Sequence, residues 1–436
     1  MSDSPPGATA TDAPADAWLY AWAGANVAIG VASLLVPLYV VQLGGDAFAL
    51  GVLWFATSIA MAPSAVVVGP VVDRLGNHRR LVLAGFLGVA AALAALPFLH
   101  TVPAVVLVDA ALWFAVAGVT PVLTTLALAD VPERRWNARL ARLNKYQGYG
   151  WAGGLVLGAV WTSALAGRLS SLAVQRSLLG VATVVVAVST LVAARTLPRA
   201  EGADDSRLRR RPSRRAVRAV FSPLLPGRVV SIVRSSDPRA LLTGVSRPLA
   251  AYFAAVTVFF VGFSVFSAPL PDFLTTAGFG DDAVFALYVV SSLASAVCYV
   301  AAGELADRYD LRVLQSSALG LRGLVFPVVA AAGYGLRASP TGLLVVGVTF
   351  ALVGVSWAVI AVTANSLVAR YANRENRGAA LGLYTALSSV AGGVGGLLGG
   401  WLAATYAYFT TFALAGGLVV AGAGVVLALD RVEPGA

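Results

Sequence analysis

The sequence predicts an all-α membrane protein whose twelve transmembrane helices form two six-helix repeats. Hydrophobic residues make up 58% of the chain and charged residues only 12%, whereas soluble domains average about 45–50% apolar and about 25% charged. Apolar stretches of about 20 residues, each long enough to cross a hydrocarbon core of about 30 Å, recur throughout the chain. A charged Gly-x-x-x-Asp-Arg turn occurs once in each half, starting at Gly69 and again at Gly303. A turn repeated in this way indicates a duplicated membrane unit.

Apolar windows place the twelve predicted spans in two groups of six. The first group covers residues 17–41, 47–71, 78–99, 103–128, 142–165 and 173–196. The second group covers residues 248–271, 283–305, 312–335, 340–366, 378–403 and 406–428.

These spans divide the chain into five expected parts. They are a disordered tail at 1–16, a first bundle at 17–196, a basic linker at 197–247, a second bundle at 248–429 and a short tail at 430–436. The linker carries seven arginines between positions 207 and 218 and has no 20-residue apolar run, so we expect it outside the bilayer. Its charges either form a face held in place by topology or belong to a basic amphipathic helix on anionic lipid.

Residue types missing from the spans exclude several classes of function. The single cysteine, Cys298, excludes an intramolecular disulfide and a cysteine-based metal site, and two distant histidines exclude a histidine cluster. The only lysine, Lys145, does not lie in a phosphate-binding loop. We therefore expect no metal, no cofactor and no enzymatic activity. The net charge of +10 comes mostly from loops and the linker, so it does not indicate nucleic acid as a partner.

The arginines also predict the orientation. The expected opposite side holds only Arg168, Arg176 and Arg337. Besides the linker, the loops on the side of the tails hold Arg74, Arg79, Arg80, Arg134, Arg135, Arg139, Arg308, Arg312, Arg370, Arg374 and Arg377. Positive loops stay in the cytoplasm, so we expect both termini to be cytoplasmic and the protein to lie in the plasma membrane.

The repeat extends beyond the charged turn. The fourth span contains Phe-Ala-x-x-Gly-Val ending around Gly118, and the tenth span contains the same pattern around Gly354. An Ala-Gly-Gly triplet at 152–154 in the fifth span returns at 391–393 in the eleventh. The halves are therefore expected to be parallel repeats.

These features resemble the major facilitator superfamily of secondary transporters, and the likeness covers about Trp18 to Leu429. Its loop motif after the second span is matched by Gly69, Asp73, Arg74, Gly76 and Arg80. The second copy is matched by Gly303, Asp307, Arg308 and Arg312, with Tyr309-Asp310 in place of the usual apolar-Gly pair.

The resemblance implies a conformational latch at the cytoplasmic rim. In the family, the carboxylate at Asp73 faces the start of the eleventh span, and Asp307 faces the start of the fifth. Arg74 and Arg80 can bridge acids in the loop after the fourth span, where Asp130 is available. Such contacts hold the halves together when the cavity faces outward and break when it faces inward. The alternative is that these charges only mark topology.

Polar and aromatic residues within the spans are candidates for substrate binding or coupling. Asp109 lies two turns into the fourth span, where a charge is costly unless it has a function or reaches the headgroup zone. Asn26 either binds substrate or joins two helices. Arg322 is expected to snorkel or to pair with Glu304, and substrate contact is the alternative. The remaining candidates, which open the fifth span or form an aromatic cavity wall, are Trp113, Lys145, Tyr146, Tyr252 and Trp357.

From this resemblance we expect a monomeric secondary transporter working by alternating access in contact with membrane lipid. Export of an amphipathic or apolar small molecule, driven by an H⁺ or Na⁺ gradient, is the first reading because the cavity helices carry few charges. Import of a polar metabolite is the alternative, and a transport-inactive sensor is the alternative from another class. A sensor would be expected to lose the latch residues, yet Asp73 and Asp307 are both present.

The expected topology is directly testable. Protease should cut the linker between Arg199 and Arg247 only from the cytoplasmic side, in inside-out vesicles and not in intact cells. Cleavage in intact cells would overturn the orientation and the placement of the charged turns.

Overall fold

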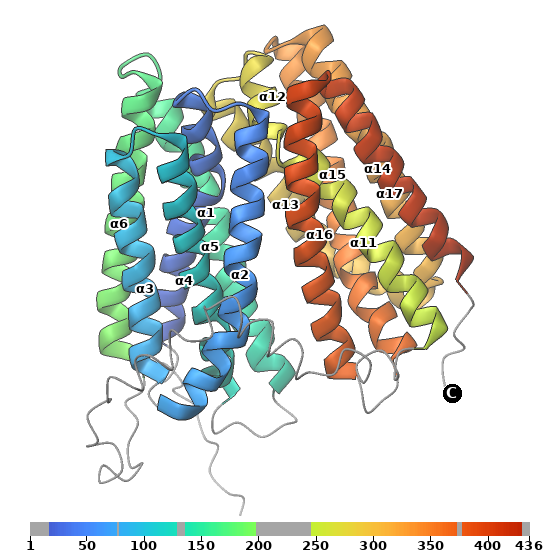
Figure 1. The fold of residues 1–436 in the computed structure, drawn as a ribbon, viewed down its shortest axis with the longest axis horizontal. Coiled ribbons are helices and arrows are strands. Elements are labelled where there is room, and N and C mark those ends of the chain that lie inside the picture. Colours follow the sequence, from blue (N-terminus) through green and yellow to red (C-terminus); the bar gives the residue numbers. More distant parts are fainter. Residues whose placement is uncertain (1–16, 76–77, 129–135, 198–245, 373–376, 430–436) are drawn as a thin grey trace, which may run out of the picture.

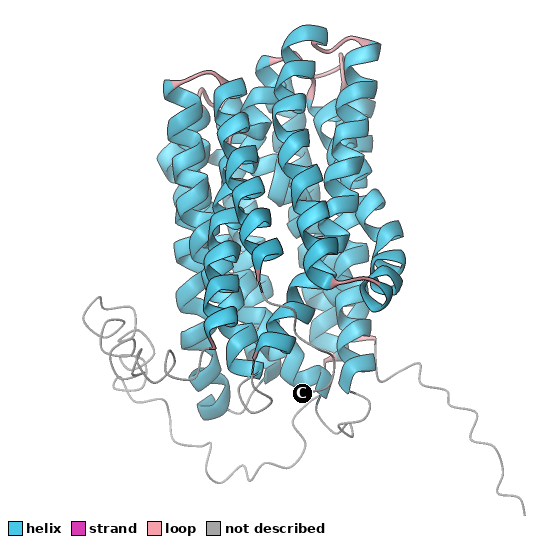
Figure 2. Cartoon of the chain, turned by 90° about the vertical axis from the view of Figure 1, so that its right-hand side faces the viewer, coloured by secondary structure: helices cyan, strands magenta, loops and turns pink. Residues whose placement is uncertain are grey.

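The computed structural model describes residues 17–75, 78–128, 136–197, 246–372 and 377–429, and over these ranges the chain contains helices and no strands (Figures 1 and 2). In the first half the helices are α1 (Trp18–Gln42), α2 (Ala47–Leu75), α3 (His78–Ala95) with the short η1 (Leu96–Phe98), α4 (Val102–Leu128), α5 (Trp136–Leu165) and α6 (Ser171–Thr196). In the second half they are α11 (Arg247–Ser267) with the short α12 (Leu270–Thr276), α13 (Asp281–Arg308), α14 (Leu311–Leu336), α15 (Pro340–Tyr371), α16 (Arg377–Thr405) and α17 (Tyr408–Ala428).

The predicted fold class is confirmed. Ten of these helices are long and apolar enough to cross a membrane, and α2 contributes a shorter apolar stretch, Ala47–Met61, within its described side chains. The helix α5 begins six residues before the predicted span, because helical hydrogen bonding continues past the apolar window into a segment that carries Arg139.

Side chains at the loops explain where several helices begin. Ser170, Ser246 and Ser339 each accept a hydrogen bond from the backbone N–H three residues later, which caps α6, α11 and α15. Asp310 caps α14 by accepting a hydrogen bond from the backbone N–H of Arg312, two residues later. Gly44, at a φ of 86°, turns the chain after α1 in a conformation that favours glycine.

The packing of the helices repeats between the halves. In the first half α1 packs on α5 and α6, α2 packs on α4, and α3 packs on α4 and α6. The corresponding pairs in the second half are α11 with α16 and α17, α13 with α15, and α14 with α15 and α17. The largest contacts between the halves are α2 with α16 and α5 with α13, which are also equivalent in the repeat, and α12 makes smaller contacts with α1 and α2. The contacts therefore show the duplication that the sequence motifs predicted.

The bundle has two ends. The linker end is where α6 ends and α11 begins, and the far end is where α1 ends and α2 begins. Near the far end α2 and α16 lie side by side, and toward the linker end they diverge (Figure 1).

Glycines allow α2 and α16 to touch backbone to backbone at the far end. A Cβ on Gly400 would lie 2.5 Å from the carbonyl oxygen of Ala47 and 2.7 Å from the Cα of Gly51. A Cβ on Gly51 would lie 2.8 Å from the carbonyl oxygen of Gly396. Membrane helices lack a hydrophobic force between them and depend on such close contacts.

Substituting Gly400 should therefore open the far end. Gly400→Ala places a methyl group against the backbone of α2, and overpacking costs about 1–3 kcal/mol. We expect a population shift of about tenfold or more toward states in which the far ends are apart. Spin labels at Phe48→Cys and Tyr406→Cys, in a Cys298→Ala background, would measure this shift as a longer distance between the labels.

Gly417→Ala is the matched control, because a Cβ at Gly417 meets no atom within 4 Å. An unchanged distance distribution in Gly400→Ala would show that this contact does not hold the far end closed.

Candidate functional site

The candidate site lies in the interior of the bundle and has two parts, one in each half. The first part, the carboxyl site, consists of Thr57 on α2 and of Asp109 and Trp113 on α4. The second part, the arginine–aromatic cluster, consists of Arg322 and the rings around it from α11, α14, α15 and α16.

In the carboxyl site, Asp109 is buried, with 3% of its surface exposed. It lies seven residues after the start of α4, which at a rise of 1.5 Å per residue is about 10 Å from the far end of that helix. The Thr57 hydroxyl lies 3.1 Å from Asp109 Oδ2, and Asp109 Oδ1 has no hydrogen-bond partner. Trp113, one turn further along α4, offers its indole N–H as a hydrogen-bond donor to this carboxyl group.

The Thr57 hydroxyl has one hydrogen and two acceptors within reach. Its Oγ1 lies 2.8 Å from the carbonyl oxygen of Leu53 and 3.1 Å from Asp109 Oδ2. With an ionised Asp109, the two acceptors compete for that hydrogen. With a proton on Oδ2, Asp109 donates to Thr57 and Thr57 donates to Leu53, so both bonds form. This geometry fits a carboxyl group that can hold a proton.

The carboxyl site lies next to the contact of α2 with α16, which joins the halves. Trp54 and Ser58, on either side of Thr57 along α2, pack on α16: Cβ atoms built on Gly396 and Gly393 would lie 2.7 Å from Trp54 Cβ and 2.8 Å from Ser58 Cβ. A change in the hydrogen bonding of Asp109 therefore acts on the segment of α2 that packs against the second half.

The other first-half candidates occupy different places. Asn26 is buried at the contact of α1 with α5 and donates to the carbonyl oxygen of Trp22 on its own helix, at 2.8 Å. The Tyr146 ring meets Tyr20 of α1 edge-on, with 5.4 Å between ring centroids. Lys145 is exposed near the linker end and lies 5.5 Å from the centroid of the Tyr149 ring.

In the second half, Tyr252 is fully buried and its hydroxyl is hydrogen bonded to Gln315 of α14, at 3.1 Å. It joins two helices of one bundle. Trp357 is 36% exposed and contacts Phe260 and Phe263 of α11.

The structure differs from the expectation for Arg322, which neither snorkels nor pairs with Glu304. Its guanidinium turns into the bundle, where Nη1 donates to the carbonyl oxygen of Val353 at 2.9 Å and lies 3.3 Å from Ser356 Oγ. Hydropathy places a residue along a helix and not around its axis, so the apolar pattern of this span does not predict the direction of the side chain.

Those latch residues that the structure describes lie at the linker end. Gly76 and Asp130 are not described, and for Gly69, Asp73 and Arg74 the helix is described without its side chains. Arg80, Asp307 and Arg308 are exposed, and a Cβ on Gly303 would meet no atom within 4 Å. Arg312 pairs with Asp310 at 2.8 Å and donates to the carbonyl oxygen of Leu429, which ties α14 to α17 within the second half.

The contacts between the halves that the structure describes in detail lie at the far end, not among the latch residues. Gln175 of α6 donates to Asp281 Oδ2 of α13, at 2.8 Å, and this hydrogen bond joins the halves in the part of the chain that the structure describes. On α5, Gly158 packs against the ring of Phe285 of α13. Together with the glycine contact of α2 and α16, these contacts close the far end.

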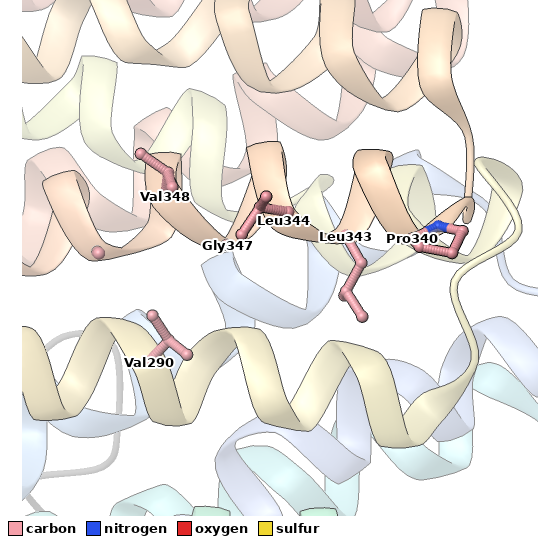
Figure 3. A pocket seen from close by; sticks show the side chains of 7 residues that line it. Val290, Pro340, Leu343, Leu344, Gly347 and Val348 are labelled. Carbon is pink, nitrogen blue, oxygen red and sulfur yellow. The ribbon is translucent and has the colours of Figure 1, made fainter.

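An apolar groove of about 480 Å³ lies elsewhere, between α13 and α15 (Figure 3). Its walls are Val290, Pro340, Leu343, Leu344, Gly347, Val348 and Ala351. Several of these side chains are exposed, as expected for a surface that faces lipid. The groove offers no polar side chain to recognise a solute, so it is not part of the candidate site.

The fold and the interior polar groups define a class, the two-repeat helical membrane transporters. The family model described as Major Facilitator Superfamily matches residues 6–141 and 138–395. The chain belongs to this superfamily and is a multi-pass membrane transporter. The comparison with curated proteins gives no match.

Solved transporter structures share the fold at low sequence identity. The nucleoside transporter NupG has a TM-score of 0.71 at 15% identity, covering 94% of this chain and 98% of that one. A POT family transporter in complex with 5-aminolevulinic acid has a TM-score of 0.69 at 12% identity, covering 94% of each chain. A bacterial homolog of the human lysosomal transporter Spinster, in an inward-facing and unoccupied conformation, has a TM-score of 0.65 at 12% identity and covers 97% of this chain and 96% of that one.

The latch hypothesis predicts a shift toward the state described here, with the far end closed. Asp73→Asn removes a carboxylate that faces a helix end, an interaction of about 0.3–1 kcal/mol. We expect a two- to fivefold rise in alkylation of a reporter, Tyr149→Cys in the Cys298→Ala background, together with slower transport and normal insertion. Unchanged alkylation with normal transport would show that Asp73 has no latch role.

Proposed function

We propose that this protein is an alternating-access exporter of a small amphipathic molecule, driven by the proton gradient across the plasma membrane. The observation that supports it best is the distribution of contacts between the halves. Glycine packing and the bond from Gln175 to Asp281 close the far end, while α2 and α16 diverge toward the linker end (Figure 1). With the linker end in the cytoplasm, this is the state that accepts cargo from inside.

Asp109 is the proposed proton carrier. Its carboxyl group is buried, has one oxygen without a hydrogen-bond partner, and forms more hydrogen bonds when Oδ2 is protonated. Closing the protein around an ionised carboxylate in this place is costly, so passage between the two states favours the protonated form. A proton taken up from outside and released inside would return the empty carrier to the inward-facing state.

The position of Asp109 supports a role in proton coupling more than a position in the lipid headgroup region. A residue of the headgroup zone would reach water or lipid, whereas this side chain contacts α2 next to the residues that pack on α16. Protonation therefore acts where the halves separate during transport.

The test measures accumulation and exchange separately in proteoliposomes. With one proton exchanged per cargo molecule, a gradient of one pH unit supports about tenfold accumulation. Asp109→Asn should lower accumulation to the level of the passive distribution, because an amide cannot load or release the proton. Exchange of cargo down its own gradient should remain near the wild-type rate.

Two further variants sharpen this test. Thr57→Val removes the hydroxyl that bonds Asp109 and should weaken coupling, whereas Thr190→Val removes a buried hydroxyl that bonds only its own helix and should have no effect. Accumulation that persists in Asp109→Asn would exclude this residue as the carrier. Accumulation in right-side-out vesicles under an inward proton gradient would instead support import of a polar metabolite.

A further inference from the structure

A buried guanidinium lies among aromatic rings in the second half. Arg322 is eleven residues into α14, about 16 Å along the helix and near the middle of a bilayer core of about 30 Å. Its Cζ atom lies 4.5 Å from the ring centroid of Phe263, 5.7 Å from that of Trp357 and 5.8 Å from that of Phe326. Only 8% of the residue is exposed.

This charge has no counter-charge. None of the carboxylates in the described ranges forms an ion pair with Arg322, although buried charges are ordinarily paired and those inside membranes usually serve a function. Contacts with aromatic rings and two neutral acceptors offset the cost of burial only in part.

The unused donors of Arg322 lie on one edge of the guanidinium. Nη1 is bonded to Val353 and Ser356. Nε is buried with no hydrogen-bond partner, and no bond to Nη2 occurs among the described residues. Nε and Nη2 are neighbouring donors, and they form the edge that binds both oxygens of a carboxylate at once.

The rings extend from the guanidinium to a partly exposed surface. Trp357 is 36% exposed, and Phe260 and Tyr384 are partly buried. Phe260 meets both of these rings edge-on, at centroid distances of 6.5 Å from Trp357 and 6.1 Å from Tyr384. They come from α11, α15 and α16, whereas Arg322 comes from α14 and contacts this group of rings through Trp357. The flat apolar surfaces therefore continue beyond the guanidinium onto helices other than α14.

We propose that Arg322 and the arginine–aromatic cluster are the cargo subsite for an organic carboxylate with a flat apolar body. The carboxylate binds the Nε–Nη2 edge, and the flat body packs against Trp357 and Phe260. This proposal rests on the proposed transport function and narrows its cargo from an amphipathic molecule to an aromatic carboxylate.

Binding of matched acid and amide pairs to the full-length protein in nanodiscs tests the proposal. The probes are 1-naphthoate with 1-naphthamide and indole-3-acetate with indole-3-acetamide, titrated by calorimetry. We expect each acid to bind at least tenfold more tightly than its amide. Arg322→Met should remove this preference. Arg322→Lys keeps the positive charge but cannot donate two parallel hydrogen bonds to a carboxylate, so it should retain only part of the preference.

Two controls separate recognition of the carboxylate from packing. Trp357→Phe should weaken acid and amide alike, because it reduces the flat surface and leaves the guanidinium in place. Arg195→Met removes an exposed arginine of α6 and should leave the preference unchanged. The ratio of acid to amide affinity is the readout, and a variant that merely lowered stability would not change it.

Several results would overturn the proposal. They are equal affinity for acid and amide, absence of binding by both acids, an acid preference that survives in Arg322→Met, and tighter Arg322-dependent binding of phenyl phosphate than of the acids. Thermal unfolding gives a further check: loss of a purely structural arginine should lower the melting temperature of the unliganded protein, whereas loss of an uncompensated charge should leave it equal or higher.

The subsite and the transport function can fail independently. Arg322-dependent binding of the acids without flux in proteoliposomes would support the subsite and contradict the exporter. Flux of the neutral amide that is insensitive to Arg322→Met would support the transporter and overturn the subsite.

Discussion

The close contact of α2 with α16 is the constraint on which the arrangement of the two halves depends. Gly51 and Gly400 bring the backbones together where any side chain would hold them apart. Helices in lipid gain little from burying apolar groups against one another, so close packing decides which helices associate. Its counterpart in the repeat, α5 with α13, is less extensive. In the proposed transport cycle, these contacts hold the far end closed in the state described here and separate when that end opens.

The buried charges are placed with respect to this contact. Asp109 bonds Thr57, whose neighbours on α2 pack on the glycines of α16. Arg322 lies in the second bundle against rings of α11, α14 and α15, and Phe260 of α11 continues this group of rings to Tyr384 of α16. Either charge is costly in a low-dielectric interior, and the cost falls when a proton or an anion arrives. Binding at each place thus changes the energy of a helix that takes part in the separation of the halves.

The sequence was sufficient for the fold because hydropathy and duplication act over whole segments. Apolar runs predict helices that must satisfy their own backbone in lipid, and the paired motifs around Gly118 and Gly354 predict the repeat that the helix contacts confirm. The side chains of the site depend on rotation about the helix axis, which a non-periodic apolar span does not reveal. The direction of the Arg322 side chain was therefore predicted wrongly, and the expected cavity residue Tyr252 lies inside one bundle, bonded to Gln315. The latch assignment of Asp73 stays a prediction.

Alignment of the two repeats shows which residues of the candidate site have an equivalent in the other half. The pattern that begins at Phe114 returns at Phe350, and on this alignment Asp109 corresponds to Val345. Likewise Trp357, three residues after Gly354, corresponds to Pro121, three residues after Gly118. The glycines at 118 and 354 and the glycine pairs at 153–154 and 392–393 occur in both halves, whereas this carboxyl group occurs only in the first half and this tryptophan only in the second. In the proposed cycle, this asymmetry lets the proton and the cargo bind at different places. Coupling would then run through the contact of α2 with α16, because the residues beside Thr57 pack there against the second half.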